Sequence, residues 1–172
     1  LIPYFLWNNR GPGEMKVWLP FRESGARPTP APTTAYTSKV NGSIQNKALA
    51  SITDQLEPAN SNDHTWPYYH WWPNNNRWEW VRFDFAKPET VSKVKVYWFD
   101  DGPFGGCRIP DVWEIEYLAG SSWKKVSPVS PLIVTKDAWN SAEFAPVKAA
   151  GLRINVKLNR EFSSGIHEVI IE

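Results

Sequence analysis

Side chains that could bind a small polar ligand gather in three segments rich in turn-forming residues, at 53–76, 100–110 and 159–165. A sugar needs such a mixture, because its apolar ring face stacks on an aromatic side chain while fixed polar groups hydrogen bond to its hydroxyls. A segment as long as 53–76 is usually functional when it lies inside a compact domain. The candidate sugar ligands are Trp66, Tyr68, His70, Trp72, Asp101, Phe104, Arg108, Arg160 and Phe162.

Several of these residues also have a purely structural interpretation, and the sequence leaves both open. Tryptophan is highly buried on average, so Trp71 and Trp72 equally suit core packing. Arg108 could clamp a hydroxyl or a carboxylate, or it could pair with Asp100 or Asp101. Those two acids are neighbours in sequence, and neighbouring strand residues point to opposite faces, so they do not form a catalytic carboxylate pair across one bond.

Metal and thiol chemistry is limited by the small number of ligands. Cys107 is the single cysteine, which excludes an intramolecular disulfide, and no Cys–His pairing indicates a nucleophile. His64, His70 and His167 lack the spacing of a zinc site. Carboxylate oxygens are the ligands that Ca²⁺ prefers, so Asp54, Glu57 and Glu168 are candidate calcium ligands if the last strand returns beside the first loop. The alternative is a solvated acidic loop.

The elements that position these residues are β-strands. Alternation of apolar and polar residues with period 2 predicts strands at 78–85, 91–98, 111–118, 152–158 and 166–171, with weaker ones at 122–126, 132–135 and 142–144. Apolar residues near helical spacing in 44–56 predict one short helix. About eight short strands with no long helices between them predict an all-β fold, an antiparallel β-sandwich or barrel.

Composition bounds the partners and the domain organisation. The chain has 172 residues and a formal net charge of +1, so a strongly basic nucleic-acid or membrane-surface binder is not expected. No apolar run approaches the ~20 residues of a membrane-spanning helix. Two apolar runs around a turn predict a hairpin at 1–21, and alternating prolines predict a linker at 22–37. The β-sandwich is then expected at 38–172.

Several short motifs carry a family resemblance. Trp71-Trp72, Glu79-Trp80-Val81, the run VKVYWFDD at 94–101, GGCRIP at 105–110 and the ending at 162–168 resemble a discoidin-type domain. This is the galactose-binding-like, jelly-roll β-sandwich of coagulation factor 5/8 C-type domains and many carbohydrate-binding modules. WFDD and GGCRIP, together with the opening segment at 2–20, resemble the C-terminal part of bacterial glycoside hydrolases of the β-L-arabinofuranosidase type.

The resemblance implies a non-catalytic module that binds carbohydrate at the loops. The catalytic residues of those hydrolases lie in an upstream domain of the same polypeptide, and such enzymes are secreted, periplasmic or on the bacterial cell surface. A structural Ca²⁺ near Asp54 and Glu168 is also implied. The first loop, which contains the segment at 66–70, departs from the family's common form because it is longer and more aromatic.

Two other functions remain in view. The chain could be a structural module that packs on the catalytic domain and binds no sugar. It could also be an enzyme in its own right, which would need an acid/base carboxylate pair about 5–9 Å apart, and the sequence indicates none.

Overall fold

The alternating segments form seven β-strands within residues 31–172, the part of the chain that the computed structural model describes. The strands are β1 (Lys39–Gly42), β2 (Tyr69–His70), β3 (Trp78–Phe99), β4 (Val112–Ala119), β5 (Ser122–Lys125), β6 (Trp139–Lys157) and β7 (Gly165–Ile171). A short 3₁₀ helix, η1 (Lys47–Thr53), lies between β1 and β2. The predicted hairpin at 1–21 and the first part of the predicted linker lie outside the described residues.

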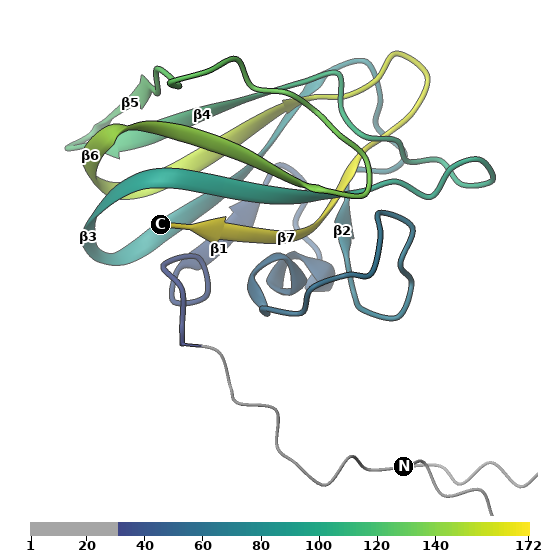
Figure 1. Ribbon diagram of the computed structural model, residues 1–172, viewed down its shortest axis with the longest axis horizontal. Coiled ribbons are helices and arrows are strands. Elements are labelled where there is room, and N and C mark those ends of the chain that lie inside the picture. The colour runs from purple at the N-terminus through teal and green to yellow at the C-terminus, as the bar shows by residue number, and fades with distance from the viewer. Residues whose placement is uncertain (1–30) are drawn as a thin grey trace, which may run out of the picture. The chain divides into compact units, whose positions relative to one another are not determined.

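Two long strands, β3 and β6, run through both layers of a β-sandwich (Figure 1). Their halves at 78–84 and 151–157 pair with each other, β1 adds to β3, and β4 followed by β5 adds to β6. Their other halves pair at 89–97 and 139–149, and there β7 followed by β2 adds to β3. A register shift between Asp84 and Glu89 separates the halves. The β3–β6 pair therefore bends at this shift, so that its two halves belong to the two layers of the sandwich. The all-β prediction is confirmed.

The core lies between the two layers and consists of the inward faces that the alternation predicts. The indole rings of Trp98 on β3 and Trp113 on β4 meet edge to face across the layers, with centroids 5.8 Å apart. The buried set from the strands includes Val81, Phe83, Val94, Val96, Ile115, Leu152, Ile154, Val156, Ile166 and Val169. Burying aliphatic side chains of this size contributes about 1.5–3 kcal/mol each, so this core supports the loops at its end.

Some boundaries differ from those predicted. The strands expected at 78–85 and 91–98 are one strand, β3, and the strand expected at 132–135 is absent from the described structure. Pro128 and Pro131 precede that segment and have no backbone N–H to donate to a ladder. The short helix is confirmed as η1, and Asn46 caps it by accepting a hydrogen bond from the backbone N–H of Ala48 at 3.0 Å.

The segment before β1 is also packed. Residues 33–38 form turns, the N–H of Ser38 donates to the carbonyl of Ala35 at 3.1 Å, and Ala35 is fully buried. Within residues 31–172, no helix has the length and apolar character to cross a membrane.

Candidate functional site

The three predicted loops meet at one end of the sandwich, which we call the loop rim (residues 53–76, 100–110 and 159–164). Cys107 and Ser163 form an isolated β-bridge, and the N–H of Arg108 donates to the carbonyl of Ser163 at 2.8 Å. The N–H of Trp71 donates to the carbonyl of Ser164 at 3.0 Å, which ties the first loop to the third. Figure 1 shows these loops together at the right-hand end of the molecule. These contacts place the three segments at one rim.

A hollow of about 160 Å³ opens in the loop rim. Four of the predicted sugar ligands line it, so residues from two loops are brought to one place by the fold. The lining consists of Tyr68, His70, Trp72, Phe99, Asp101, Gly106 and Cys107.

Trp72 forms an exposed aromatic wall of the hollow. Its side chain is 58% exposed, which is unusual for a residue that is generally buried. The Cδ1–Nε1 edge of the indole lies against Gly106, since a Cβ atom on that glycine would come within 2.7 Å of Trp72 Cδ1 and 2.8 Å of Nε1. The absence of a side chain at Gly106 therefore lets the indole approach the second loop this closely.

Tyr68 and His70 provide polar groups on a rigid aromatic support. The Tyr68 ring stacks on the buried Phe99 ring at 3.7 Å between centroids, and its hydroxyl hydrogen bonds to His64 Nδ1 at 3.1 Å. Burial lowers the pKa of His70 and raises the pKa of Tyr68, so both side chains are neutral at pH 7. His70 Nδ1 is buried and has no hydrogen-bond partner among the described residues.

Asp101 organises the second loop and also faces the hollow. Its Oδ1 accepts a hydrogen bond from the backbone N–H of Cys107 at 2.7 Å, and a side chain at Gly105 would overlap its carboxylate. Burial raises the pKa of the Cys107 thiol to about 12. A thiol with that pKa stays protonated, so Cys107 contributes surface to the hollow and no nucleophile.

Arg108 braces the second loop through hydrogen bonds to its backbone carbonyls. Nη1 donates to the carbonyls of Gly105 at 3.0 Å and Cys107 at 2.6 Å, and Nη2 donates to the carbonyl of Pro103 at 3.2 Å. The guanidinium also lies 3.5 Å from Asp101 Oδ1 and stacks 4.2 Å above the Phe162 ring. Arg108 and Phe162 therefore support the hollow from outside its lining.

The remaining candidates lie on the loops without lining the hollow. Phe104 is 99% exposed at the tip of the second loop, Trp66 is 37% exposed, and Arg160 is exposed. The sequence reasoning missed Phe99 and Gly106. A register shift between Tyr97 and Trp98 interrupts the alternation from which the face of Phe99 could be inferred.

Asp54 and Glu168 form a carboxylate pair at the end of η1. Glu168 is 2% exposed, and burial together with the Asp54 carboxylate raises its pKa to about 8. Its Oε2 accepts from the N–H of Gln55 at 3.1 Å, while Oε1 is buried with no partner among the described residues. Burial also raises the pKa of Asp54.

The structure does not place Glu57 with this pair. Glu57 is exposed, and its Oε1 accepts a hydrogen bond from the indole N–H of Trp139 at 2.8 Å. No group of three His, Cys, Asp or Glu side chains within residues 31–172 is arranged to hold a metal ion. The Glu57 carboxylate is thus held by Trp139 on β6 rather than by the residues around Asp54 and Glu168.

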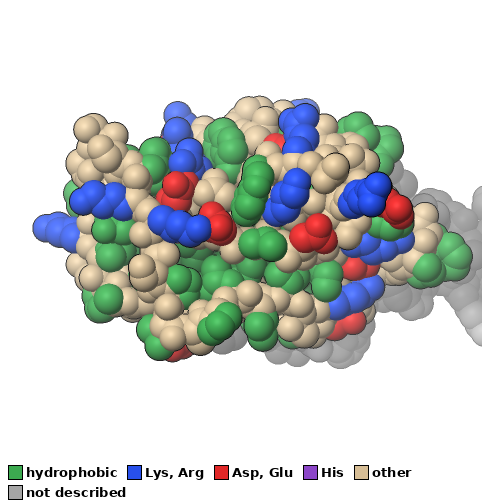
Figure 2. Space-filling view, turned by 90° about the horizontal axis from the view of Figure 1, so that it is seen from above, with side chains coloured by type: hydrophobic (Ala, Val, Ile, Leu, Met, Phe, Trp, Pro, Cys, Tyr) green, Lys and Arg blue, Asp and Glu red, His purple; other side chains and the backbone are tan. Residues whose placement is uncertain are grey.

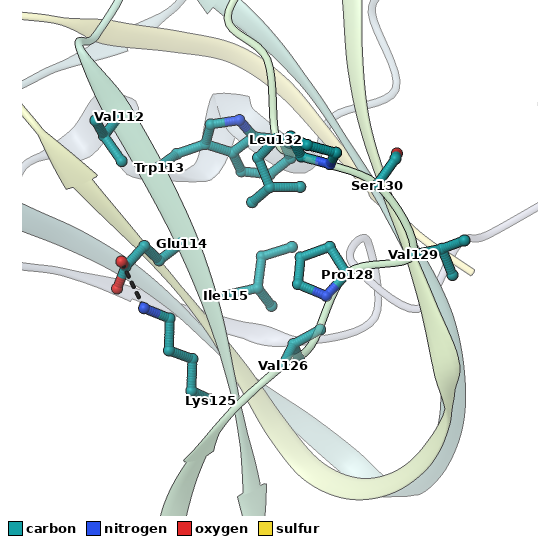
Figure 3. A pocket seen from close by; sticks show the side chains of 11 residues that line it. Val112, Trp113, Glu114, Ile115, Lys125, Val126, Pro128, Val129, Ser130 and Leu132 are labelled. Carbon is teal, nitrogen blue, oxygen red and sulfur yellow. Dashed lines mark hydrogen bonds and ion pairs between the residues drawn. The ribbon is translucent and has the colours of Figure 1, made fainter.

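A larger groove of about 480 Å³ lies along β4 and the segment after β5, and it contains none of the predicted ligands (Figure 3). Its lining is mainly apolar: Val112, Trp113, Ile115, Val126, Pro128, Val129, Pro131 and Leu132, with Ser130 and the Glu114–Lys125 ion pair at 2.6 Å. Figure 2, which views the molecule from above Figure 1, shows hydrophobic side chains gathered among charged ones.

The described residues have the discoidin-type β-sandwich fold. In comparisons with known proteins, residues 1–20 match the family model for the glycoside hydrolase family 127 C-terminal domain. The predicted resemblance is therefore confirmed in two parts: the opening segment resembles the end of a glycoside hydrolase, and the described residues have the discoidin-type fold.

Solved structures share this fold at low sequence identity. A chain of the Streptococcus pneumoniae β-galactosidase BgaA is 19% identical with a TM-score of 0.63, over 78% of this chain and 90% of that one. The Clostridium perfringens module CpGH89CBM32-5, in complex with GalNAc-β-1,3-galactose, is 11% identical with a TM-score of 0.60, over 81% and 98%. The family 32 carbohydrate-binding module of C. perfringens NanJ, in complex with galactose, is 13% identical with a TM-score of 0.58, over 81% and 98%.

Proposed function

We propose that this chain is a carbohydrate-binding accessory module of a polysaccharide-degrading glycoside hydrolase, and that it holds sugar in the hollow of the loop rim. The observation that carries the proposal is the hollow itself, where the exposed Trp72 indole stands beside the Asp101 carboxylate and the neutral His70 ring. An aromatic wall binds the apolar face of a sugar, and the polar groups accept and donate hydrogen bonds to its hydroxyls. The similarity to galactose-bound modules supports the same assignment.

The size of the hollow sets the expected affinity. A small open site buries little surface, so we expect a dissociation constant of about 0.1–1 mM, equivalent to about 4–5 kcal/mol. A catalytic domain on the same polypeptide would compensate for weak binding, because tethering raises the effective concentration of module and enzyme at one polymer.

Calorimetric titration of the full chain with galactose, L-arabinose, arabino-oligosaccharides, xylan and pectic fragments tests the proposal. We expect saturable binding that Trp72→Ala abolishes. Trp78→Ala is the matched control, since Trp78 is 49% exposed but lies outside the hollow lining. Binding that is lost equally in both variants, or no binding to any of these glycans by the folded chain, would overturn the assignment.

We also propose that Asp54 and Glu168 hold a structural Ca²⁺. The residues fit in part: two carboxylates lie together, Glu168 Oε1 is buried without a partner among the described residues, and burial raises the pKa of both acids. A bound Ca²⁺ supplies the positive charge that would let both carboxylates ionise. Backbone carbonyls and water would have to complete the ligand shell, since Glu57 bonds to Trp139. Thermal unfolding with and without Ca²⁺ tests this proposal.

The apolar groove favours a second candidate, a structural module that docks on another protein domain and binds no sugar. Val129 and Ile133 beside it are 79% and 66% exposed, and exposed apolar side chains around a groove are typical of protein contacts. If this candidate is right, the glycan titrations show no binding. The double substitution Val129→Asp and Ile133→Asp then weakens co-purification with the catalytic domain.

A further inference from the structure

We infer that the hollow binds a single uncharged sugar unit and discriminates against sugar acids. This inference rests on the proposed function and deepens it, because it names the chemical class of ligand. Its basis is the volume of the hollow and the charge of the side chains that line it.

The volume admits one ring. An engineered apolar protein cavity of about 150 Å³ binds one benzene molecule, and pockets for larger ligands measure about 300–1,000 Å³. The hollow measures about 160 Å³. A sugar unit that stacks on Trp72 therefore fills it, and the rest of an oligosaccharide has to extend into solvent. An end unit or a side branch of a polymer meets this condition more readily than an internal unit.

The charge of the lining comes from one residue. Among the seven lining residues only His70, Tyr68, Cys107 and Asp101 have side chains that can ionise. Burial keeps the first three neutral, since it lowers the pKa of His70 and raises the pKa values of Tyr68 and Cys107. The Asp101 carboxylate remains, so a ligand in the hollow meets a negative group.

Arg108 does not reverse this sign. Its guanidinium lies 3.5 Å from Asp101 Oδ1 and weakens the negative potential, but it is absent from the lining of the hollow. Both of its terminal nitrogens donate to loop carbonyls, and its planar face lies over Phe162. A sugar hydroxyl can donate to the Asp101 carboxylate, whereas a sugar carboxylate is repelled by it and finds no free cation in the lining.

The test compares matched neutral and acidic sugars by calorimetry: galactose with galacturonate, glucose with glucuronate, and mannose with mannuronate. Where a neutral sugar binds, we expect its dissociation constant to be at least tenfold lower than that of the matching acid. Raising the salt from about 0.01 M to about 1 M shortens the Debye length from about 30 Å to about 3 Å, so the discrimination should shrink. Asp101→Asn should reduce it as well, because the amide oxygen still accepts from Cys107 while the charge is gone.

Glu161→Gln is the matched control, since Glu161 is an exposed acid of the third loop outside the lining of the hollow, and it should leave the discrimination unchanged. Equal binding of galactose and galacturonate by the unmodified chain would overturn the inference and leave the proposed function standing. No binding to any member of the three pairs, nor to L-arabinose, arabino-oligosaccharides, xylan or pectic fragments, would overturn the proposed function itself. The salt series uses the unmodified chain, so the inference stays testable if Asp101→Asn fails to fold.

Discussion

Replacing Glu168 by Gln should stabilise the calcium-free protein at alkaline pH. Glu168 is buried in β7 beside Asp54, and these surroundings raise its pKa from an ordinary value of 4.5 to about 8. Between these two values the folded chain holds a proton that the unfolded chain has released. The free energy of unfolding therefore decreases as the pH rises through this interval, and below pH 4.5 the contribution of Glu168 is fully present.

The size of the effect follows from the interval. Each pH unit between the two pKa values lowers the free energy of unfolding by about 1.4 kcal/mol. A rise in pH from 4.5 to about 8 therefore lowers it by at most about 5 kcal/mol. A glutamine has no proton to lose, its amide oxygen can accept from the Gln55 N–H, and its amide nitrogen can donate to Asp54. We expect Glu168→Gln to be more stable than the unmodified chain by at least about 2 kcal/mol at pH 8.5 in EDTA, and equal to it within about 1 kcal/mol at pH 5.

Urea unfolding of both chains at pH 5, 7 and 8.5, in EDTA and in excess Ca²⁺, measures this difference. Calcium should remove the alkaline loss of stability in the unmodified chain and have little effect on Glu168→Gln. Glu57→Gln is the control, because Glu57 is exposed and bonded to Trp139, and it should keep the pH dependence of the unmodified chain. A free energy of unfolding that stays flat from pH 5 to 8.5 in EDTA would refute the reasoning.

Three further predictions concern the loop rim and its support. Gly106→Ala should weaken sugar binding at least tenfold in calorimetry, because its methyl group would meet the Trp72 indole at 2.7 Å. Arg108→Lys should lower the free energy of unfolding in urea by about 1–3 kcal/mol, since an ammonium cannot bond three carbonyls and stack on Phe162. Burial lowers the pKa of His167, so the stability that the neutral ring contributes is present above pH 6.5 and is lost as the pH falls. A phenylalanine cannot take up a proton. His167→Phe should therefore lose less free energy of unfolding than the unmodified chain between pH 7 and pH 5, as measured by urea titration.

The sheet could be predicted from sequence because its signal is local. Alternation with period 2 placed Val81, Phe83 and Ile154 on inward faces, and burial between two layers requires that pattern. The join of two predicted strands into β3 could not be predicted, because it depends on the bend at which the ladder with β6 shifts register. The strand expected at 132–135 does not form, and the Ile133 carbonyl accepts instead from the indole N–H of Trp113, 20 residues away in the sequence.

The site could be predicted only in outline. That the three loops share a rim follows from the connections of a sandwich, and the Trp71–Ser164 and Arg108–Ser163 bonds confirm it. The direction of each side chain depends on neighbours that the chain acquires on folding. The second loop folds its carbonyls around the guanidinium of Arg108, and Trp139 on β6 engages Glu57. Trp139 lies 82 residues from Glu57 in the sequence, so no local motif predicts that contact.

Amide and indole NMR spectra of the labelled full chain, recorded during a titration with galactose, test the central claim most directly. We predict saturable shifts concentrated at the Trp72 indole N–H and at the backbone amides of Tyr68, Gly106 and Cys107, which line the hollow. Shifts concentrated instead along the groove at 126–132, or no shifts with any sugar in a panel of neutral sugars, would contradict the proposed site.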